Sequence, residues 1–309
     1  MRRILPLPIA LAAAFVAATA HDARAQRRGI RDSGYRSRID TTFAFDKSGT
    51  VTVTAGNGDI IINGASGNTV HVRATSDDDN LRLDASAARL SVESSDRHNG
   101  DTRFELTVPY GVRVIARSQS GDISIRTTRG EVEAHAQSGD VLIEDATRLD
   151  VNTLSGGITA ANITGDIAVA STSGDVKVSD LRGDIDIGTV SGDITLRGVT
   201  AKNARAKTTS GDVLYDGTID KMGRYDFSTN SGDVGLHIPR DASAQLTVST
   251  WNGEFQSDFP VMLRPGEHGI GSSTSKRLTF EINGGGARIN AETFSGDVTV
   301  SSNGRGARP

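Results

Sequence analysis

Aspartate recurs along this chain directly after glycine, at a spacing that could bring the carboxylates into one column. The pairs that we assign as corners are Gly121, Asp122; Gly139, Asp140; Gly174, Asp175; Gly183, Asp184; Gly192, Asp193; Gly211, Asp212; Gly232, Asp233; and Gly296, Asp297. Stacked carboxylates repel one another unless each accepts backbone N–H bonds or a cation lies between them. A calcium-bound solenoid uses Gly-Gly-x-Gly-x-Asp, in which the aspartate does not follow its glycine directly. We therefore interpret these residues as structural corners and predict no metal site.

The other reactive side chains do not form a catalytic set. No Gly-x-Ser-x-Gly elbow, phosphate-binding loop or His-Glu-x-x-His motif occurs. The histidines, which lack metal-ligand spacing, are His21, His71, His98, His135, His237 and His268. Charged residues that a polysaccharide-cleaving β-helix could place on one lateral face are Lys177, Asp184, Asp186 and Arg197. We predict no catalytic residue and no cofactor, and we keep a carbohydrate-active β-helix enzyme as the alternative.

Hydroxyl residues form a second column, just before the corner glycines. Its members are Ser118, Thr153, Ser171, Thr189, Thr208, Thr229, Thr250 and Thr293. Such a ladder can simply stabilise the pairing of neighbouring strands. If the hydroxyls pointed outward, they would instead form a flat surface able to bind a glycan. The tripeptide Arg182-Gly183-Asp184 matches a cell-attachment motif, but we interpret it as one more corner of the repeat.

A nine-residue unit must position these columns. Between Ser173 and Thr200 the chain repeats Gly-Asp-[Ile/Val]-x-[Ile/Val]-x-x-[Leu/Val]-x. Positions three and five alternate as in a strand buried on one face, and the apolar residue at position eight is expected to return to the interior. The residues at position eight are Leu181, Val190 and Val199. Such units bury their apolar face only by stacking, which predicts an all-β, single-stranded parallel β-solenoid. The crossover rule favours a right-handed one.

Two nine-residue halves make one coil of about 18 residues. The coils are marked by Ser120, Ser138, Ser155, Ser173, Ser191, Ser210 and Ser231. At a strand spacing of about 4.8 Å, roughly ten coils would form a rod on the order of 50 Å long. The chain has no cysteine, so burial and hydrogen bonding must stabilise this rod.

The N-terminus has the features of an export signal. Arg2 and Arg3 precede an apolar stretch from Ile4 to Ala20, and Ala23-Arg24-Ala25 resembles a cleavage site. We predict a signal peptide over 1–25 and a flexible leader over 26–40. We expect no integral membrane segment in the mature chain, and a location in the periplasm or at the cell surface.

The rest of the chain is expected to form one domain, a solenoid over 41–301, followed by a disordered tail over 302–309. Its parts are longer strands over 41–116, regular coils over 117–251, and a C-terminal part over 252–301 with a loop excursion. That excursion contains Glu267 and His268 and follows Trp251, so a pocket beside it is conceivable, although a loop that caps the edge is favoured. The formal charge of −4 argues against nucleic acid as a partner.

Several segments together resemble a known family. They are the opening FAF…GTVTVTAGNGDIIING, the strand LTVPYGVRVIARS, the S-G-D-[IV]-x-[IVL] corners and the closing FSGDVTVSS. They resemble the bacterial toast-rack family of putative adhesins, a domain of unknown function, over about Thr41 to Ser301. The resemblance implies an exported right-handed β-helix without established enzymatic activity, and therefore supplies no catalytic residues.

We expect an exported, non-enzymatic β-solenoid, an adhesin or structural protein of the cell envelope. It would present a repetitive lateral surface to a polymer such as a glycan, or to an envelope protein. Besides the enzyme named above, the second alternative is an envelope signalling or scaffold module.

Overall fold

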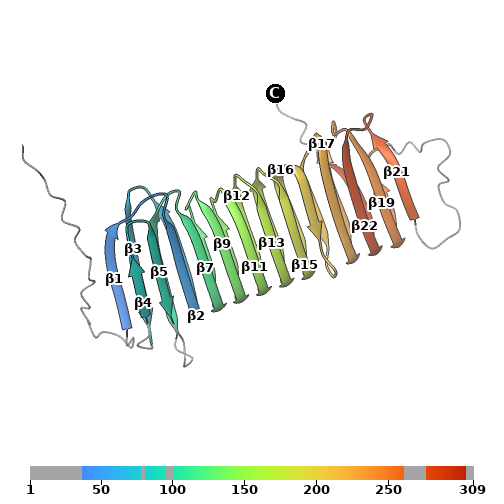
Figure 1. Cartoon of the computed structure of the whole chain (residues 1–309). Helices are drawn as coiled ribbons and strands as arrows, with labels where there is room; N and C mark the ends of the chain where they lie inside the picture. Colours follow the sequence, from blue (N-terminus) through green and yellow to red (C-terminus); the bar gives the residue numbers. More distant parts are fainter. Residues whose placement is uncertain (1–36, 78–80, 95–100, 261–275, 304–309) are drawn as a thin grey trace, which may run out of the picture.

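The protein is an elongated rod built from β-strands (Figure 1). The structure is a computed structural model that describes residues 37–77, 81–94, 101–260 and 276–303. No helix capable of crossing a bilayer is found in these ranges. Several predicted features lie outside the described residues. They are the signal peptide, the leader up to residue 36, residues 78–80, His98, the excursion over 261–275 with Glu267 and His268, and the tail from residue 304.

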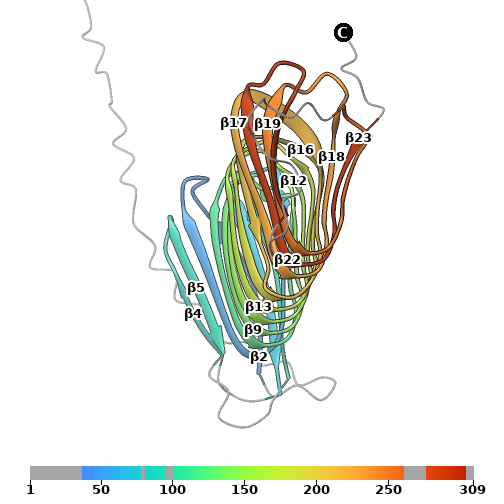
Figure 2. The ribbon, with the colours of Figure 1, turned by 90° about the vertical axis from the view of Figure 1, so that its right-hand side faces the viewer.

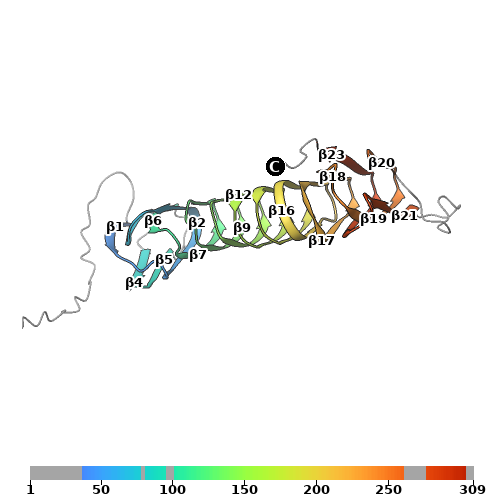
Figure 3. The ribbon, with the colours of Figure 1, turned by 90° about the horizontal axis from the view of Figure 1, so that it is seen from above.

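The strands form two ladders that face each other across a narrow core (Figure 3). We call them sheet I and sheet II. In spatial order, sheet I contains β4(Leu81–Ala85), β5(Arg89–Ser94), the first half of β2(Thr50–Ala65), β7(Arg113–Ser120), β9(Glu131–Ser138), β11(Arg148–Ser155), β13(Ile167–Ser173), β15(Ile185–Ser191), the later parts of β16(Ile194–Lys207) and β17(Val213–Ser231), β22(Ala287–Ser295), β19(Ala244–Asn252) and β21(Lys276–Ile282). Sheet II contains β1(Ser37–Ala44), β3(Thr69–Ser76), β6(Thr102–Pro109), the second half of β2, β8(Ile123–Arg126), β10(Val141–Glu144), β12(Ile158–Ile163), β14(Val176–Leu181), the first parts of β16 and β17, β18(Val234–Pro239), β23(Val298–Asn303) and β20(Phe255–Ser257).

Each coil runs through one strand of each sheet, and in the middle of the rod neighbouring coils are parallel (Figure 2). Leu149 pairs with Ile167, and Ile167 pairs with Ile185, so one coil there spans 18 residues. This confirms the all-β parallel solenoid and its coil length. The apolar residues at positions three and five of the repeat are buried along both sheets, as the alternation requires.

Position eight of the repeat is not always buried, contrary to the expectation from sequence. Leu181 and Val199 are in the core, but Val190 is 52% exposed and Thr189 is buried in its place. The reason is that β15 continues as a straight strand up to Ser191, so its inward residues stay at every second position after Ile185. The coil bends inward again only on the sheet II side.

The coils do not follow chain order at the C-terminal end. β22 lies between β17 and β19 (Figure 1), and β23 lies between β18 and β20. The last described segment of the chain therefore forms an internal coil, while the earlier β19 and β20 lie outside it. β21, which pairs antiparallel with β19, is the last strand of sheet I.

The N-terminal end is closed by antiparallel strands. β1 pairs with β3, β3 pairs with β6, and β4 pairs with β5. β1 begins at Ser37, so residues 37–40 of the expected leader belong to the sheet, and β23 reaches Asn303, two residues into the expected tail. Antiparallel edge strands of this kind end the parallel ladder and leave less of it open to further pairing.

Aromatic side chains fill the core where the coils lengthen towards the C-terminus. Tyr215, Tyr225 and Phe227 pack against one another, with ring centroids 5.9 Å apart for the two tyrosines and 5.0 Å for Tyr215 and Phe227. The Tyr225 hydroxyl donates to the Ala201 carbonyl at 2.7 Å and accepts the Asp220 N–H at 2.8 Å. Burial raises the pKa of Tyr225 to about 12, so this hydroxyl keeps its proton at neutral pH.

Candidate functional site

The glycines of the eight Gly-Asp pairs assigned as corners all have positive φ angles. The values are 118° for Gly121, 119° for Gly139, 132° for Gly174, 159° for Gly183, 140° for Gly192, 136° for Gly211, 140° for Gly232 and 150° for Gly296. Seven of the pairs form the corner from sheet I to sheet II. The pair Gly183-Asp184 lies instead at the opposite corner, where the chain enters β15 of sheet I.

The aspartates at the first corner form a hydrogen-bonded ladder along the rod. Asp122 Oδ1 accepts the backbone N–H of Asp140 at 2.8 Å, and Asp193 Oδ1 accepts that of Asp212 at 2.9 Å. Gly157 has no carboxylate, but its N–H still donates to Asp140 at 2.8 Å. Each carboxylate therefore acts as an acceptor for the next coil. No group of three His, Asp or Glu residues suited to a metal ion occurs in the described ranges.

Asp184 makes the corresponding contacts at the opposite corner. Its N–H donates to Asp166 Oδ1 at 3.0 Å, and its carboxylate accepts the N–H of Asn203 at 2.9 Å and Nδ2 of Asn203 at 2.7 Å. Burial alone would raise the pKa of Asp184, but the hydrogen bonds from Asn203 outweigh it, and the pKa is lowered. Its carboxylate is thus held in the charged form, as part of the corner.

The hydroxyl column is buried, so it cannot be an outward glycan-binding surface. Its residues continue the inward alternation of each strand and are at most 8% exposed. Thr208 Oγ1 donates to the Gly192 carbonyl at 3.1 Å, and Thr229 Oγ1 donates to the Gly211 carbonyl at 2.9 Å. These bonds tie the end of one strand to the corner of the preceding coil. Ser171 differs, because its buried Oγ has no hydrogen-bond partner.

The charged residues considered for polysaccharide cleavage are not brought together. Asp184 and Asp186 lie at the start of β15 in sheet I. Lys177 is in β14 and Arg197 in the first part of β16, both in sheet II. The four residues therefore divide between the two sheets and do not line one site.

An open groove runs along the rod on the outer face of sheet I, and the sequence analysis did not identify it. We call it the axial groove; it has a volume of about 600 Å³ and crosses β2, β7, β9, β11 and β13. One side is lined by Gln119, Gln137, Leu154 and Thr172, and the other by Thr54, Arg117, His135, Asn152 and Ala170. The residues between them are Ala55, Ser118, Ala136, Thr153 and Ser171.

A second hollow of about 350 Å³ adjoins the axial groove. The two share Asn152 and Ala170, and the hollow continues over Ala168 and Gly188, where small side chains leave the backbone uncovered. The far side is formed by Arg205 and Lys207. Ala170 pairs with Gly188 in the register of β13 with β15, so two small residues lie side by side there.

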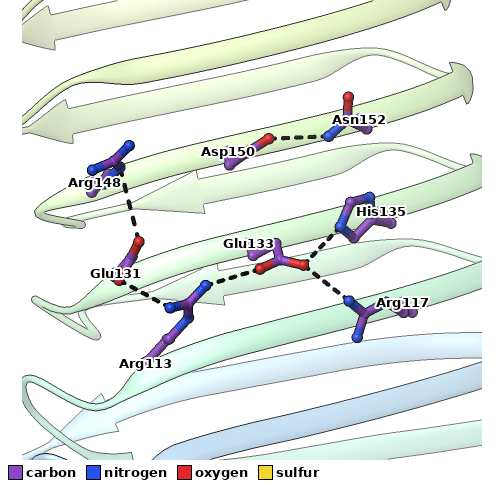
Figure 4. A network of polar contacts seen from close by, with 8 residues as sticks. All are labelled: Arg113, Arg117, Glu131, Glu133, His135, Arg148, Asp150 and Asn152. Carbon is purple, nitrogen blue, oxygen red and sulfur yellow. Dashed lines mark hydrogen bonds and ion pairs between the residues drawn. The ribbon is translucent and has the colours of Figure 1, made fainter.

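The two ionisable residues of the axial groove share one carboxylate (Figure 4). Arg117 Nη2 and His135 Nε2 each lie 2.9 Å from Glu133 Oε1, and Arg113 Nη2 lies 3.1 Å from Glu133 Oε2. The hydrogen bond with His135 is the main cause that lowers the pKa of Glu133, with a further contribution from Arg113. The groove wall is therefore largely charge-compensated, and its other side chains are neutral.

Comparison with known proteins identifies related sequences and folds. The family model described as Toastrack DUF4097 matches residues 98–301. A "putative adhesin" from Parabacteroides distasonis is 12% identical with a TM-score of 0.40, covering 87% of this chain and 98% of that one. A "putative lipid binding protein" from the same organism is 10% identical with a TM-score of 0.41 and the same coverage. A "putative adhesin" from Bacteroides fragilis is 10% identical with a TM-score of 0.38, covering 87% and 99%. No curated protein matches the chain.

Proposed function

The chain belongs to the Toastrack DUF4097 family, and we propose that it is an exported, non-enzymatic envelope protein that binds an extended polymer along its side. The axial groove is the observation that carries this proposal. It crosses five strands in succession, so it offers side chains at equivalent positions of each coil, about 4.8 Å apart. A partner that repeats along its own length gains from such a surface, because each added unit meets a further coil.

The openness of the groove favours an extended partner over a small substrate. Small-molecule sites are usually concave and bury most of their ligand. The axial groove is shallow and open to solvent, and it runs along the rod axis. Binding there would accumulate from many modest contacts, as expected of adhesion to a glycan or an extended protein segment.

The state of the carboxylates favours binding over catalysis. A general acid that works near neutral pH needs a raised pKa. The pKa values of Glu133, Asp184 and Asp226 are instead lowered. For Asp226, burial is offset by hydrogen bonds from Lys207 and Asn290. These side chains are occupied by neighbouring coils, which supports a structural role for them.

Export is the second part of the proposal, and the pattern of residues 1–25 supports it. The intact mass of the protein recovered from the periplasm or medium of an expressing bacterium should correspond to a chain that starts at Gln26. Recovery of the full 309-residue chain in the cytoplasm would contradict this part.

The binding test uses an array of glycans and envelope polymers, with calcium or with a chelator. Ala170→Trp places a large side chain in the axial groove, and Thr159→Trp places the same side chain on β12 of sheet II as the control. We expect saturable binding to one polymer class that Ala170→Trp abolishes and Thr159→Trp retains. Equal binding by both variants would contradict the groove. Release of new reducing ends from a bound glycan would favour the enzyme.

A further inference from the structure

Large apolar side chains are exposed mainly in one column at the edge of sheet I. They are Leu154 (57% exposed), Val190 (52%), Phe294 (49%) and Trp251 (42%). Each stands two residues before a corner glycine, directly after a buried threonine. Met222, the other large apolar side chain exposed in the described residues, lies elsewhere, in the excursion of β17. Four such residues at one equivalent position point to a shared surface.

The two exposed positions that contain this column are uncharged, whereas the aspartate column lies just beyond the glycine of most of these corners. We define the neutral ridge as the two residues before each glycine at the corner from sheet I to sheet II, with Gly156 and Gly253 counted as such glycines; it runs from Gln119-Ser120 in β7 to Trp251-Asn252 in β19. In spatial order the pairs read Gln-Ser, Gln-Ser, Leu-Ser, Thr-Ser, Val-Ser, Thr-Ser, Asn-Ser, Phe-Ser and Trp-Asn, and all are exposed. The chain as a whole is 23% charged. The ridge therefore combines hydroxyls, amides and apolar groups along the rod.

An aromatic stack ends the neutral ridge. The rings of Trp251 and Phe294 are 5.7 Å apart between centroids and inclined by 20°. The adjacent Thr250 and Thr293 fix both strands, because their hydroxyls donate to the carbonyls of Gly296 and Gly232 at 3.0 and 2.9 Å. The rings are thus exposed but held by a rigid backbone, which lowers the entropy cost of binding.

One ring face of the stack is uncovered by the described residues. Phe294 lies on one side of Trp251. On the other side, the register of β19 with β21 ends where Thr250 pairs with Lys276, so no described residue of β21 lies opposite Trp251. Trp251 is 42% exposed, so part of its ring system is accessible at the end of the ridge.

From these observations we propose that the neutral ridge and the Trp251–Phe294 stack bind an uncharged polysaccharide. A sugar ring has apolar C–H faces and a rim of hydroxyls. The aromatic rings can pack against the C–H faces, and the serine, threonine and amide side chains can hydrogen-bond the hydroxyls. An anionic polymer would need cationic partners, and the ridge has none. The inference rests on the proposed function, because Gln119, Gln137, Leu154 and Thr172 belong to both the ridge and the axial groove.

Trp251 is the only tryptophan of the chain, so its fluorescence reports on this site alone. We would titrate the full-length protein with a soluble linear β-glucan and, separately, with anionic polygalacturonate. The expected result is a change in emission and reduced quenching by acrylamide with the glucan. Phe294→Ala should weaken glucan binding at least about tenfold, as truncation of a central aromatic often does. Met222→Ala is the control for an exposed apolar side chain and should bind like the unaltered protein.

Asn230→Asp adds a charge to the ridge next to Phe294 without removing a buried group, and it should also weaken glucan binding. Thermal melting of each variant distinguishes lost binding from lost folding. Tighter binding of polygalacturonate than of glucan would overturn the inference. The inference would also be overturned if glucan bound without changing the Trp251 emission, and if Phe294→Ala and Asn230→Asp bound it as tightly as the unaltered protein. In that case, sensitivity to Ala170→Trp would leave the proposed function standing, and insensitivity would remove it as well.

Discussion

The backbone N–H of Asp297 donates to Oδ1 of Asp233 at 2.7 Å, although the two residues are 64 positions apart in the chain. Asp297 in turn accepts the N–H of Glu254 at 2.7 Å. The C-terminal coil is therefore held between two earlier coils by the same contact that joins consecutive coils elsewhere. The ladder depends on the local geometry of a corner and not on chain order.

The ladder contact should contribute measurably to stability. Asp233→Ala removes the acceptor for Asp297, so we expect a loss of about 1–2 kcal/mol in the free energy of unfolding. Asp233→Asn keeps an oxygen acceptor and should lose less. Asp186→Ala, at an outward position of β15, is the control and should change stability by less than about 0.5 kcal/mol. Urea unfolding measures all three, and equal values would show that the ladder contributes nothing.

Gly188, within β15, and Gly192, at the corner that follows, should respond in opposite ways to substitution by alanine. A Cβ on Gly192, which has φ 140°, would lie 2.2 Å from the Gly174 carbonyl oxygen. Gly192→Ala should therefore cost about 3 kcal/mol or more, or prevent folding. Gly188 has no atom within 4 Å of such a Cβ, so Gly188→Ala should be neutral or stabilise by up to about 1 kcal/mol. A tolerated Gly192→Ala in thermal melting would contradict the close approach of the coils.

The inward and outward positions of β15 can be tested by introducing aspartate at each of two positions. Ile185 is 4% exposed, so Ile185→Asp buries an unpaired carboxylate and should cost about 3 kcal/mol or more. Val190 is exposed, so Val190→Asp should change the free energy of unfolding by less than about 0.5 kcal/mol. Comparable destabilisation of both variants, measured by urea unfolding, would mean that Val190 faces the core.

Stability should depend on pH through Glu133. Hydrogen bonding with His135 lowers its pKa in the folded protein, so the unfolded chain binds more protons as the carboxylate titrates. The resulting stabilisation is complete above the unfolded-state pKa near 4.5 and is lost as pH falls through the lowered folded value. Glu133→Gln should therefore lose less stability than the unaltered protein between about pH 5 and pH 3. Parallel curves for the two proteins would refute this linkage.

The sequence determines the coil because its signals are local. A glycine at φ 140°, an adjacent acceptor and alternating Ile or Val residues all act within one nine-residue unit, as around Gly192. The same signals cannot distinguish Thr189 from Val190, because both lie in the second half of β15 and the straight continuation of this strand to Ser191 decides which one is buried. That choice depends on the neighbouring coils.

Two other features could not be predicted because they depend on how distant coils stack. The insertion of β22 cannot be predicted from a repeat whose corners are chemically alike. The N–H of Asp297 donates to Asp233, and the N–H of Glu254 could do so equally well. The axial groove arises where outward side chains of five coils lie in register, including Ala170 beside Asn152. Each of these residues is a common outward-facing residue of a strand, so none of them indicates a groove by itself.

The measurement that tests the central claim most directly is the affinity of the protein for glucan fragments of increasing length, determined by calorimetry. A polymer that lies along the rod should bind more tightly with each added sugar until it spans the axial groove, and then level off. Ala170→Trp should remove this length dependence, while Thr159→Trp should keep it. A single sugar that binds as tightly as the longest fragment would contradict the account, because it would indicate one local site in place of a surface used along its length.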